Sequence, residues 1–528
     1  MRITRVASKS CAPTQGFDQI LRVAADERTR DRFPHAPDVR GVLAAAQPVL
    51  RQARPQPAVI QSLQRFNLEL NNTAGASAAE RLIHPRALVV ITGQQPALFG
   101  GPLLTLHKCI GAVLLARALE QAHGAPVVPV FWVHSVDHDI TEANRVLVPG
   151  GGDWRRAVTS IVAAGRCLAR VALDEQALAE IGALADALDL PRQLQPTLGE
   201  TLAHWSTRCL MHLLPPDLGV VLADAHQLMP HCAEFWQRSI VERNAMGEAV
   251  ATGTARVQAL GQEAQVMPRD PLQLFREDTT GARARVLSVG GLRCETAQGA
   301  QPTNEQELLA LAAAHPDRFS PGVLLRPLLQ QWLLPVCAHV NGPAENAYFA
   351  QLPEPFAAAR LPLPALLPRP SLSWVPRRAE RWIKQFGVDP ESLLTLPSAW
   401  PTPAPSESAE QQKLQQAAQA LAQIAHDAGA TSGAEAQAAA FSATIAKATE
   451  RFLAALEHRR NETEGSARTA RHKLSALLHP HSEPQERALS AWAVLGPTAR
   501  EDIATAFTNF DPFDYRHALV RLGAEELS

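Results

Sequence analysis

The sequence is poor in cysteine, methionine, tyrosine and lysine. It has 528 residues, of which 7 are cysteine, 5 are methionine and 2 are tyrosine. The cysteines are odd in number, scattered and without any C-x-x-C pair, which argues against a disulfide framework and against a zinc site of paired thiolates. We expect a buried, reduced thiol at each position: Cys11, Cys109, Cys167, Cys209, Cys232, Cys294 and Cys337.

Long hydrophobic runs are also absent. The longest uncharged stretch, residues 87–107, is interrupted by glycine and proline well short of a bilayer span. Residues 1–17 lack the apolar run of a secretory signal. The 50 basic and 52 acidic residues leave a net charge of -2, so no global field attracts nucleic acid or anionic lipid. These features predict a cytoplasmic protein with neither nucleic acid nor membrane as a partner.

The first 396 residues have the pattern of an α/β core. Residues 1–85 indicate helices, with apolar steps that include Ile20, Val23 and Ala24 and a loop at 71–77. The apolar runs 87–91 and 126–133 flank an apolar helix at 103–121, which is typical of a parallel sheet buried on both faces. Further strands are expected at 145–148, 218–223 and 335–340, further helices at 200–214 and 344–352, and inserted segments near 150–200 and 245–320.

The C-terminal part has a different composition. Residues 397–408 are rich in proline and serine and predict a linker. Residues 409–480 then predict an antiparallel coiled-coil hairpin that turns at 429–433, while 481–528 return to a globular pattern and should pack onto the core through Phe507, Phe510, Phe513 and Tyr515. The expected seam consists of Leu414, Ala417, Leu421, Ile424 and Ala428 facing Phe441, Ile445, Ala448, Phe452 and Ala455. Such an exposed seam favours a homodimer.

The first group of candidate site residues follows the strand at 87–91. Ligands of parallel sheets bind at the carboxyl ends of strands, and a helix N-terminus offers free N–H groups to an anion. Lys108 is notable because the chain has no other lysine between Lys9 and Lys384. Two interpretations of Lys108 remain: it binds a phosphate or carboxylate as a compact positive charge, or it is an ordinary solvated lysine. The group consists of Thr92, Gly93, Gln94, Gln95, Gly101, Pro102, Thr105, His107 and Lys108.

The second group follows the strand at 126–133 and consists of His134, Asp137, His138, Asp139 and Glu142. An aspartate beside a histidine can fix its tautomer and raise its basicity, so we expect His138 to act as a general base with Asp137 and Asp139 as its partners. His107 is the rival base. A metal site and a structural turn are the alternatives, because no ligand spacing here is diagnostic.

The third group surrounds the strand at 335–340 and consists of Arg326, Gln330, Asn341, Glu345 and Tyr348. A Gly-Pro turn again leads from a strand end into a helix, with Glu345 in its first turn. Glu345 could simply complement the helix dipole. Polar groups at three strand ends of one sheet nevertheless favour a shared crevice.

These motifs resemble the cysteine-adding enzymes of bacillithiol biosynthesis. The resemblance rests on ITGQQPALFGGPLLTLHK (91–108), FWVHSVDHDITEAN (131–144), FSPGVLLRPLLQQWLLPVCAHVNGPAENAYFAQL (319–352), LPALLPRPSL (363–372) and DPFDY (511–515), so it covers nearly the whole chain. The sequence departs from the family pattern at Ala97, Gly100, Leu104, Val136, Asn341 and Ala344. Val136 stands where the family has an acid, which puts in doubt any mechanism that needs that acid.

The resemblance implies a Rossmann-type core with inserted connecting segments and a C-terminal coiled coil used for dimerisation. It implies ligation of cysteine to the amine of glucosaminyl malate as the last step of bacillithiol synthesis. A free carboxylate is a poor electrophile, so activation by ATP or another adenine nucleotide is expected, although no lysine-rich signature loop supports it. The alternatives are a metal-dependent hydrolase using His134, Asp137, His138 and Asp139, a nucleotidyltransferase-like enzyme in the same crevice, and a coiled-coil scaffold.

Overall fold

The computed structural model describes residues 1–6, 26–52, 55–267, 270, 272–296, 299–395, 397–400, 409–463, 466–508 and 510–523. At its centre lies a five-stranded sheet in the order β13-β12-β2-β3-β6, in which all neighbouring strands are parallel. Its strands are β2 (Leu88–Gln94), β3 (Val127–Val133), β6 (Val221–Asp224), β12 (Val336–Asn341) and β13 (Ala365–Pro368). The predicted Rossmann-type parallel sheet is therefore confirmed.

Both faces of the sheet are buried, which explains the continuous apolar runs. Leu88 and Val90 pack with α2 (Val39–Val49) and α5 (Leu103–His123) on one face. Val89 and Ile91 pack on the other face with the apolar residues of α3 (Pro57–Glu69), α10 (Ala233–Val241) and α13 (Arg326–Leu333). Successive side chains of a strand point to opposite faces, so every position of such a strand needs an apolar residue.

Helix α5 follows the predicted bounds closely. It begins after Pro102 and ends at Gly124, whose φ of 65° is the left-handed conformation that suits glycine. The predicted loop at 71–77 is wrong, because α4 (Thr73–Glu80) begins there with Asn72 as its cap; Asn72 Oδ1 accepts from Gly75 N at 3.0 Å. No helix among the described residues is long and apolar enough to cross a membrane.

Two predicted assignments near the sheet are corrected. Residues 145–148 belong to β4 (Arg145–Gly150), which pairs antiparallel with β5 (Asp153–Val158) in a separate sheet instead of joining the central one. The start of the chain is a strand, β1 (Arg2–Val6), where a helix was expected. The predicted helical positions Ile20, Val23 and Ala24, and also Cys11, lie outside the described residues.

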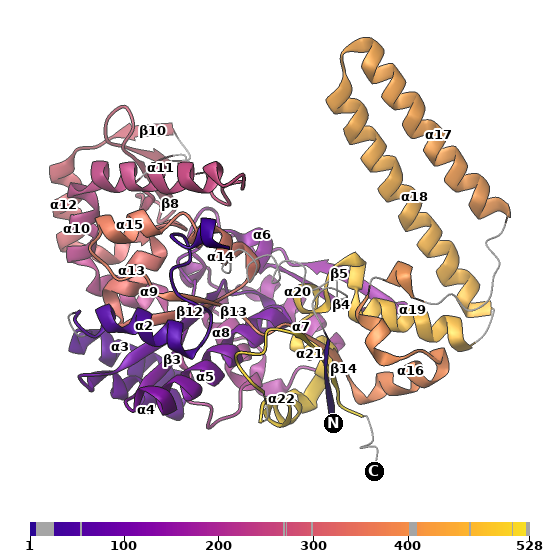
Figure 1. Ribbon diagram of the computed structural model, residues 1–528, viewed down its shortest axis with the longest axis horizontal. Coiled ribbons are helices and arrows are strands. Elements are labelled where there is room, and N and C mark those ends of the chain that lie inside the picture. The colour runs from indigo at the N-terminus through magenta and orange to yellow at the C-terminus, as the bar shows by residue number, and fades with distance from the viewer. Residues whose placement is uncertain are drawn as a thin grey trace.

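The inserted segments form two outlying parts of the body. The first contains β4, β5, α6 (Ile140–Ala143), α7 (Glu175–Ala187) and α8 (Leu202–Leu213). The second is an antiparallel sheet in the order β10-β9-β8-β7-β11 with helices around it (Figure 1). Its strands are β7 (Leu274–Glu277), β8 (Arg283–Leu287), β9 (Arg293–Thr296), β10 (Gly299–Pro302) and β11 (Phe319–Pro321). The helices nearby are α9 (Ala225–Leu228), α11 (Arg243–Ala259), α12 (Glu305–Ala314), α14 (Pro343–Phe349) and α15 (Pro353–Ala358).

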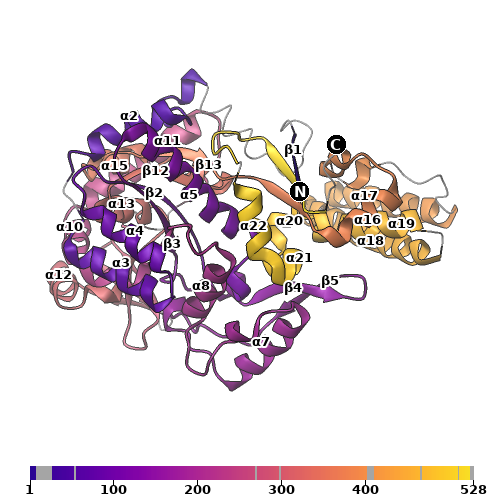
Figure 2. The ribbon, with the colours of Figure 1, turned by 90° about the horizontal axis from the view of Figure 1, so that it is seen from below.

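The C-terminal segment packs against the body. The strand β15 (His517–Arg521) lies between β1 and β14 (Leu372–Val375), so both ends of the described chain share one small sheet (Figure 2). Phe507 and Phe510 are buried in the same apolar cluster as α20 to α22. These helices are α20 (Gln485–Ala488), α21 (Ala491–Leu495) and α22 (Ala499–Phe507).

The predicted linker overlaps the body at its first residues. Trp400 is only 2% exposed, and its ring lies 6.1 Å from that of Phe386 and 5.9 Å from that of His479. Phe386 ends α16 (Glu380–Phe386), and His479 follows α19 (Ser466–Leu478). Residues 401–408 lie outside the described residues.

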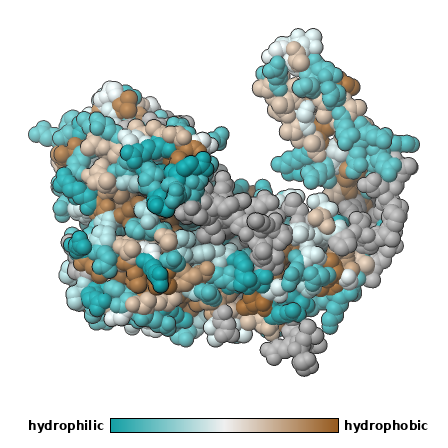
Figure 3. Space-filling view, viewed as in Figure 1, coloured by the Kyte–Doolittle hydropathy of each residue, from teal (hydrophilic) through white to brown (hydrophobic). Residues whose placement is uncertain are grey.

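The helices α17 (Ala409–Ser432) and α18 (Glu435–Thr463) form an antiparallel hairpin that stands away from the body (Figures 1 and 3). Its contact line shares Leu414 and Ile445 with the predicted seam and is shifted by one position elsewhere. The less exposed residues of this line are Leu414, Ala418, Ala422, Ala425 and Gly429 on α17, Ala434 before α18, and Ala438, Ser442, Ile445, Thr449, Leu453 and Leu456 on α18. At Gly429 a Cβ atom would lie 2.5 Å from Cβ of Ala438, so the two helices touch closely at the turn end.

Candidate functional site

A cleft of about 400 Å³ lies beside the carboxyl end of β3. The central sheet contributes Trp132, His134 and Asp137 to its wall, and the inserted sheet contributes Phe275 and Arg283 from β7 and β8. We call it the strand-end cleft. Its charged lining residues are Asp137, Arg283, Arg285 and Arg326, which gives a net charge of +2. This cleft is therefore suited to an anionic ligand.

His134 reaches the cleft because β2 has a glycine beside it. A Cβ atom at Gly93 would lie 2.7 Å from Nε2 of His134, so only glycine leaves room for this imidazole. Burial, and then the positive charges of Arg326 and Lys108, hold the pKa of His134 well below its usual value. The ring is consequently neutral at physiological pH, so one of its two nitrogens is unprotonated.

Arg283 organises the opposite wall of the cleft. Its guanidinium lies 3.9 Å from the ring centroid of Phe275, and its Nε donates to Ser320 Oγ at 2.8 Å. A second guanidinium nitrogen lies 3.2 Å from Nδ1 of His138. Because arginine only donates, Nδ1 of His138 is the acceptor in this contact, and a neutral ring then carries its proton on Nε2.

Asp137 is ionised in this arrangement. Burial would raise its pKa, but the contacts with His138 and the charge of Arg283 outweigh burial and hold the pKa of Asp137 well below its usual range. Its Oδ1 accepts from the backbone N of His138 at 2.7 Å and lies 3.6 Å from Nδ1 of the same residue. Asp137 therefore organises the loop after β3 mainly through the backbone.

Asp139 has a structural role. Its Oδ1 accepts from Thr141 N at 3.0 Å and from Thr141 Oγ1 at 2.6 Å, so it caps α6 instead of supporting an imidazole. Its carbonyl accepts from Nε2 of Gln95 at 2.5 Å, which joins the loops after β2 and β3.

Part of the first predicted group lines a second cavity of about 240 Å³. It contains Gln94, Gln95, Gly101, Pro102 and Glu142 from the predicted set, together with Arg145, Arg156 and Arg487. Two cavities therefore stand where the sequence predicts a single crevice. Asp137 and Arg326 line the strand-end cleft, and Gln94 and Gln95 line the other cavity.

Lys108 lies in the interior between two of the predicted groups. Its side chain is 4% exposed, and Nζ lies 2.5 Å from Glu345 Oε2, 2.8 Å from Gln94 Oε1 and 3.0 Å from Gly93 O. Burial lowers the pKa of Lys108, and the charge of Glu345 opposes this. Glu345 also accepts from Gly342 N at 2.8 Å at the start of α14. Lys108 therefore ties the end of β2 to α14.

His107 points into the core, which corrects the expectation that it lies on the wall of the crevice. It is 0% exposed. Trp374 Nε1 donates to His107 Nε2 at 2.9 Å, and Nδ1 lies 3.0 Å from Glu486 Oε2, which also accepts from Arg369 at 2.8 Å. Both ring nitrogens have partners and burial lowers the pKa of His107, so it is not placed to act as the base.

Five other predicted residues contact protein groups and do not line either cavity. Thr92 Oγ1 donates to Val340 O at 2.7 Å, and Asn341 Nδ2 donates to Asn346 Oδ1 at 3.1 Å. Tyr348 accepts from Arg326 at 2.6 Å, so it orients the guanidinium in the cleft. Thr105 and Gln330 are buried and do not line either cavity.

Two residues of the cleft, Phe275 and Arg283, were missing from the predicted site. His134 belonged to the second predicted group, but the role of base was assigned to His138. Arg283 and Phe275 come from the inserted sheet, about 140 residues further along the chain, and carry no local motif.

The fold and cleft define a Rossmann-type α/β protein with a small, positively charged cleft at its strand ends. Comparison with known families agrees: residues 26–370 match the family described as "Bacillithiol biosynthesis BshC, N-terminal Rossmann-like domain". The chain therefore belongs to the BshC family.

Individual relatives extend the match. A protein of Heliobacterium modesticaldum is 31% identical over 392 residues, which cover 68% of this chain and 71% of the relative. One of Exiguobacterium sibiricum is 31% identical, with 65% of this chain and 68% of the relative covered. One of Shouchella clausii is 29% identical over 451 residues, covering 80% and 82%. Each of these relatives bears the name "Putative cysteine ligase BshC".

Proposed function

We propose that this chain is a ligase that joins the carboxyl group of cysteine to the amine of glucosaminyl malate in bacillithiol biosynthesis. The family and the names of its relatives support a cysteine ligase. The observation that carries the acceptor assignment is the net charge of +2 around the strand-end cleft. The malate group has two carboxylates, for which arginine is the preferred partner because its planar fork matches their geometry.

The neutral imidazole of His134 supplies the second requirement. An amine attacks a carbonyl only after it has lost its proton, so the site needs an acceptor that is unprotonated at the working pH. We assign that role to His134. His138, whose Nδ1 accepts from Arg283, offers an Nε2 proton and is assigned to holding a substrate oxygen.

The carboxyl group must be activated before the amide bond forms. If ATP is the co-substrate and adenylation is the route, a cysteine carboxylate oxygen attacks the α-phosphorus and pyrophosphate leaves. The amine then attacks the acyl carbon, AMP leaves, and His134 takes the amine proton. We place the acceptor in the strand-end cleft, with the neighbouring cavity beside Gln94 and Gln95 as the candidate position for a nucleotide.

The hydrolase alternative finds no support in this geometry. Within the described residues, His134, Asp137, His138 and Asp139 do not form a group whose ligand atoms converge. The nucleotidyltransferase-like alternative is tested together with the main proposal.

The decisive experiment incubates the purified chain with cysteine and glucosaminyl malate, with and without ATP, and measures the product mass. We expect a product equal to both substrates minus one water, formed only with ATP. Arg283→Gln should raise the KM for the acceptor, whereas Arg381→Gln, an exposed arginine of α16, should not. Nucleotide turnover without an amide product would favour the nucleotidyltransferase alternative, and no change in Arg283→Gln would remove the cleft assignment.

A further inference from the structure

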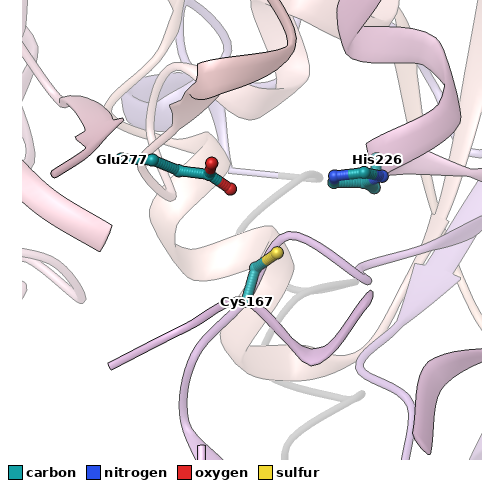
Figure 4. Close-up of side chains that lie close together, drawn as sticks. All are labelled: Cys167, His226 and Glu277. Atoms are coloured by element: carbon teal, nitrogen blue, oxygen red, sulfur yellow. The ribbon is translucent and has the colours of Figure 1, made fainter. Parts of the chain in front are cut away.

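Three side chains from distant parts of the sequence converge outside the two cavities. Cys167, His226 and Glu277 each offer one ligand atom, and these atoms all lie within 4.8 Å of one another. The side chains point toward a common space (Figure 4). Among the residues that the structure describes, this is the one group of at least three such side chains with that geometry.

Two of the three side chains show features of metal ligands. Nε2 of His226 is buried and has no hydrogen-bond partner, which is costly unless something binds there. Oε1 of Glu277 accepts from Arg170 Nε at 2.7 Å, an outer contact that orients the carboxylate and leaves its other oxygen available.

The backbone holds these residues in place. The loop of Cys167 is fixed by Leu168 N, which donates to Asp137 O at 2.8 Å. His226 N donates to Asp224 Oδ1 at 2.8 Å and to Ser135 Oγ at 3.0 Å. Glu277 is the last residue of β7. The cluster therefore does not need a large rearrangement to close around an ion.

We propose that Cys167, His226 and Glu277 bind a Zn²⁺ ion. One thiolate, one imidazole and one carboxylate form a donor set that zinc accepts, and three protein ligands leave a fourth position for water. On binding, the S–H bond of Cys167 breaks, its proton passes to solvent and a sulfur–zinc bond forms. The thiolate and carboxylate together neutralise the charge of the ion.

The ion would tie the inserted sheet to the central sheet. None of its three ligands lines the strand-end cleft. Phe275, which does line it, lies two residues before Glu277 on β7, and the loop of Cys167 holds the Asp137 carbonyl. The site thus positions two walls of the cleft without contacting the substrate.

Cys167 shows that the cysteine pattern leaves one kind of metal site open. The absence of C-x-x-C excludes a site of paired thiolates, but one cysteine can join a histidine and a carboxylate from other segments. No spacing in the sequence could show this, because 59 residues separate Cys167 from His226 and 51 separate His226 from Glu277.

The test measures zinc on the full-length chain after chelator treatment and equilibrium dialysis against Zn²⁺. We expect one zinc per chain. Loss of a residue that only hydrogen-bonds to a metal ligand usually weakens metal binding about 10- to 100-fold. Loss of a ligand itself should have a larger effect, so we expect zinc binding to weaken by at least about 100-fold in each of the variants Cys167→Ser, His226→Gln and Glu277→Gln. Cys294→Ala is the matched control, because Cys294 is a buried thiol on β9 of the inserted sheet and lies outside the cluster.

Cobalt gives an independent readout. The chain loaded with Co²⁺ should show a sulfur-to-cobalt charge-transfer band, which should disappear in Cys167→Ser and persist in Cys294→Ala. Circular dichroism checks that each variant folds, and the remaining variants decide if one does not. Zinc binding that is absent in the parent chain, or equal in the parent and the three ligand variants, would overturn the proposal.

Discussion

One side of the 409–463 hairpin is expected to bind a second copy of the chain. Leu421 and Ile424 each precede a contact residue of α17, and Phe441 and Phe452 each precede one of α18. A step of one residue turns a helix by about 100°, and in an antiparallel pair the same step on both helices leads to the same side. The four side chains, 41% to 63% exposed, therefore share one face.

The exposed fractions give the size of the effect. Complete burial of a Leu, Ile or Phe side chain contributes about 1.5–3 kcal/mol. Since these four are roughly half exposed, each has about 1 kcal/mol left to gain on burial, or about 8 kcal/mol for the two copies of a symmetric dimer. Replacing Phe441 and Phe452 by serine removes about half of this, which corresponds to roughly a 1000-fold increase in the dimer Kd.

Sedimentation velocity over a range of chain concentrations measures this Kd. The matched control is Gln419→Ser with Ala443→Ser, because both residues are exposed and follow a contact residue, so they lie on the opposite side of the hairpin. Circular dichroism should show equal helix content in both double variants. An unchanged Kd for Phe441→Ser with Phe452→Ser, or a parent chain that stays monomeric, would show that this face does not join two copies.

Three other substitutions test the site and its support. Lys108→Ala removes charge-assisted contacts within the protein, each of about 1.5–3 kcal/mol, and should lower the unfolding free energy in urea by a comparable amount, whereas exposed Lys384→Ala should not; equal stability of parent and variant would show that Lys108 does not tie β2 to α14. His134→Gln should lower kcat about 100- to 10,000-fold and His138→Asn should mainly raise KM; the reverse order would return the role of base to His138. Glu486→Gln removes the carboxylate that forms an ion pair with buried Arg369 and should lower the unfolding free energy in urea at pH 7 by about 3–5 kcal/mol. Burial would raise the folded-state pKa of Glu486, but Arg369 and His107 outweigh burial and lower this pKa. The stabilisation by the Glu486 carboxylate is therefore present above the usual carboxyl pKa and is lost as the pH falls. The difference in unfolding free energy between parent and variant should shrink in acid, and a constant difference would contradict the assignment.

The central sheet was predictable because both of its faces are buried. The runs at 87–91 and 126–133 have no polar position, which excludes a strand with one face in water. The error at Arg145–Val148 has the same origin. A short apolar run identifies a buried strand but not its partner, and the partner here, β5, is largely polar.

The hairpin was predictable in type but not in its contact line. In an alanine-rich helix two adjacent faces have similar residues, so the periodicity of three and four does not select between them. The predicted seam included the large side chains Leu421, Phe441 and Phe452, yet close contact at Gly429 and Ala438 requires small ones. Packing distance decides the face, and that distance is a tertiary property.

The candidate site was predictable only where it follows strand ends. Asp137 lies at such an end and lines the cleft. The scarcity of lysine selected Lys108, but its burial among three acceptors depends on how α14 meets β2. The contribution of Arg283 has no local signal, because it arises when an inserted sheet folds over the cleft.

The small sheet that joins the two ends of the described chain affects how the chain folds during synthesis. Arg5 of β1 hydrogen-bonds to the carbonyl of Arg516, which lies 511 residues later. At about 5–20 residues per second, the partner of β1 is made roughly 25–100 s after β1 itself. During that interval Ile3 and Val6 have no strand beside them, so the nascent chain carries an open strand edge at β1 until β15 has been made.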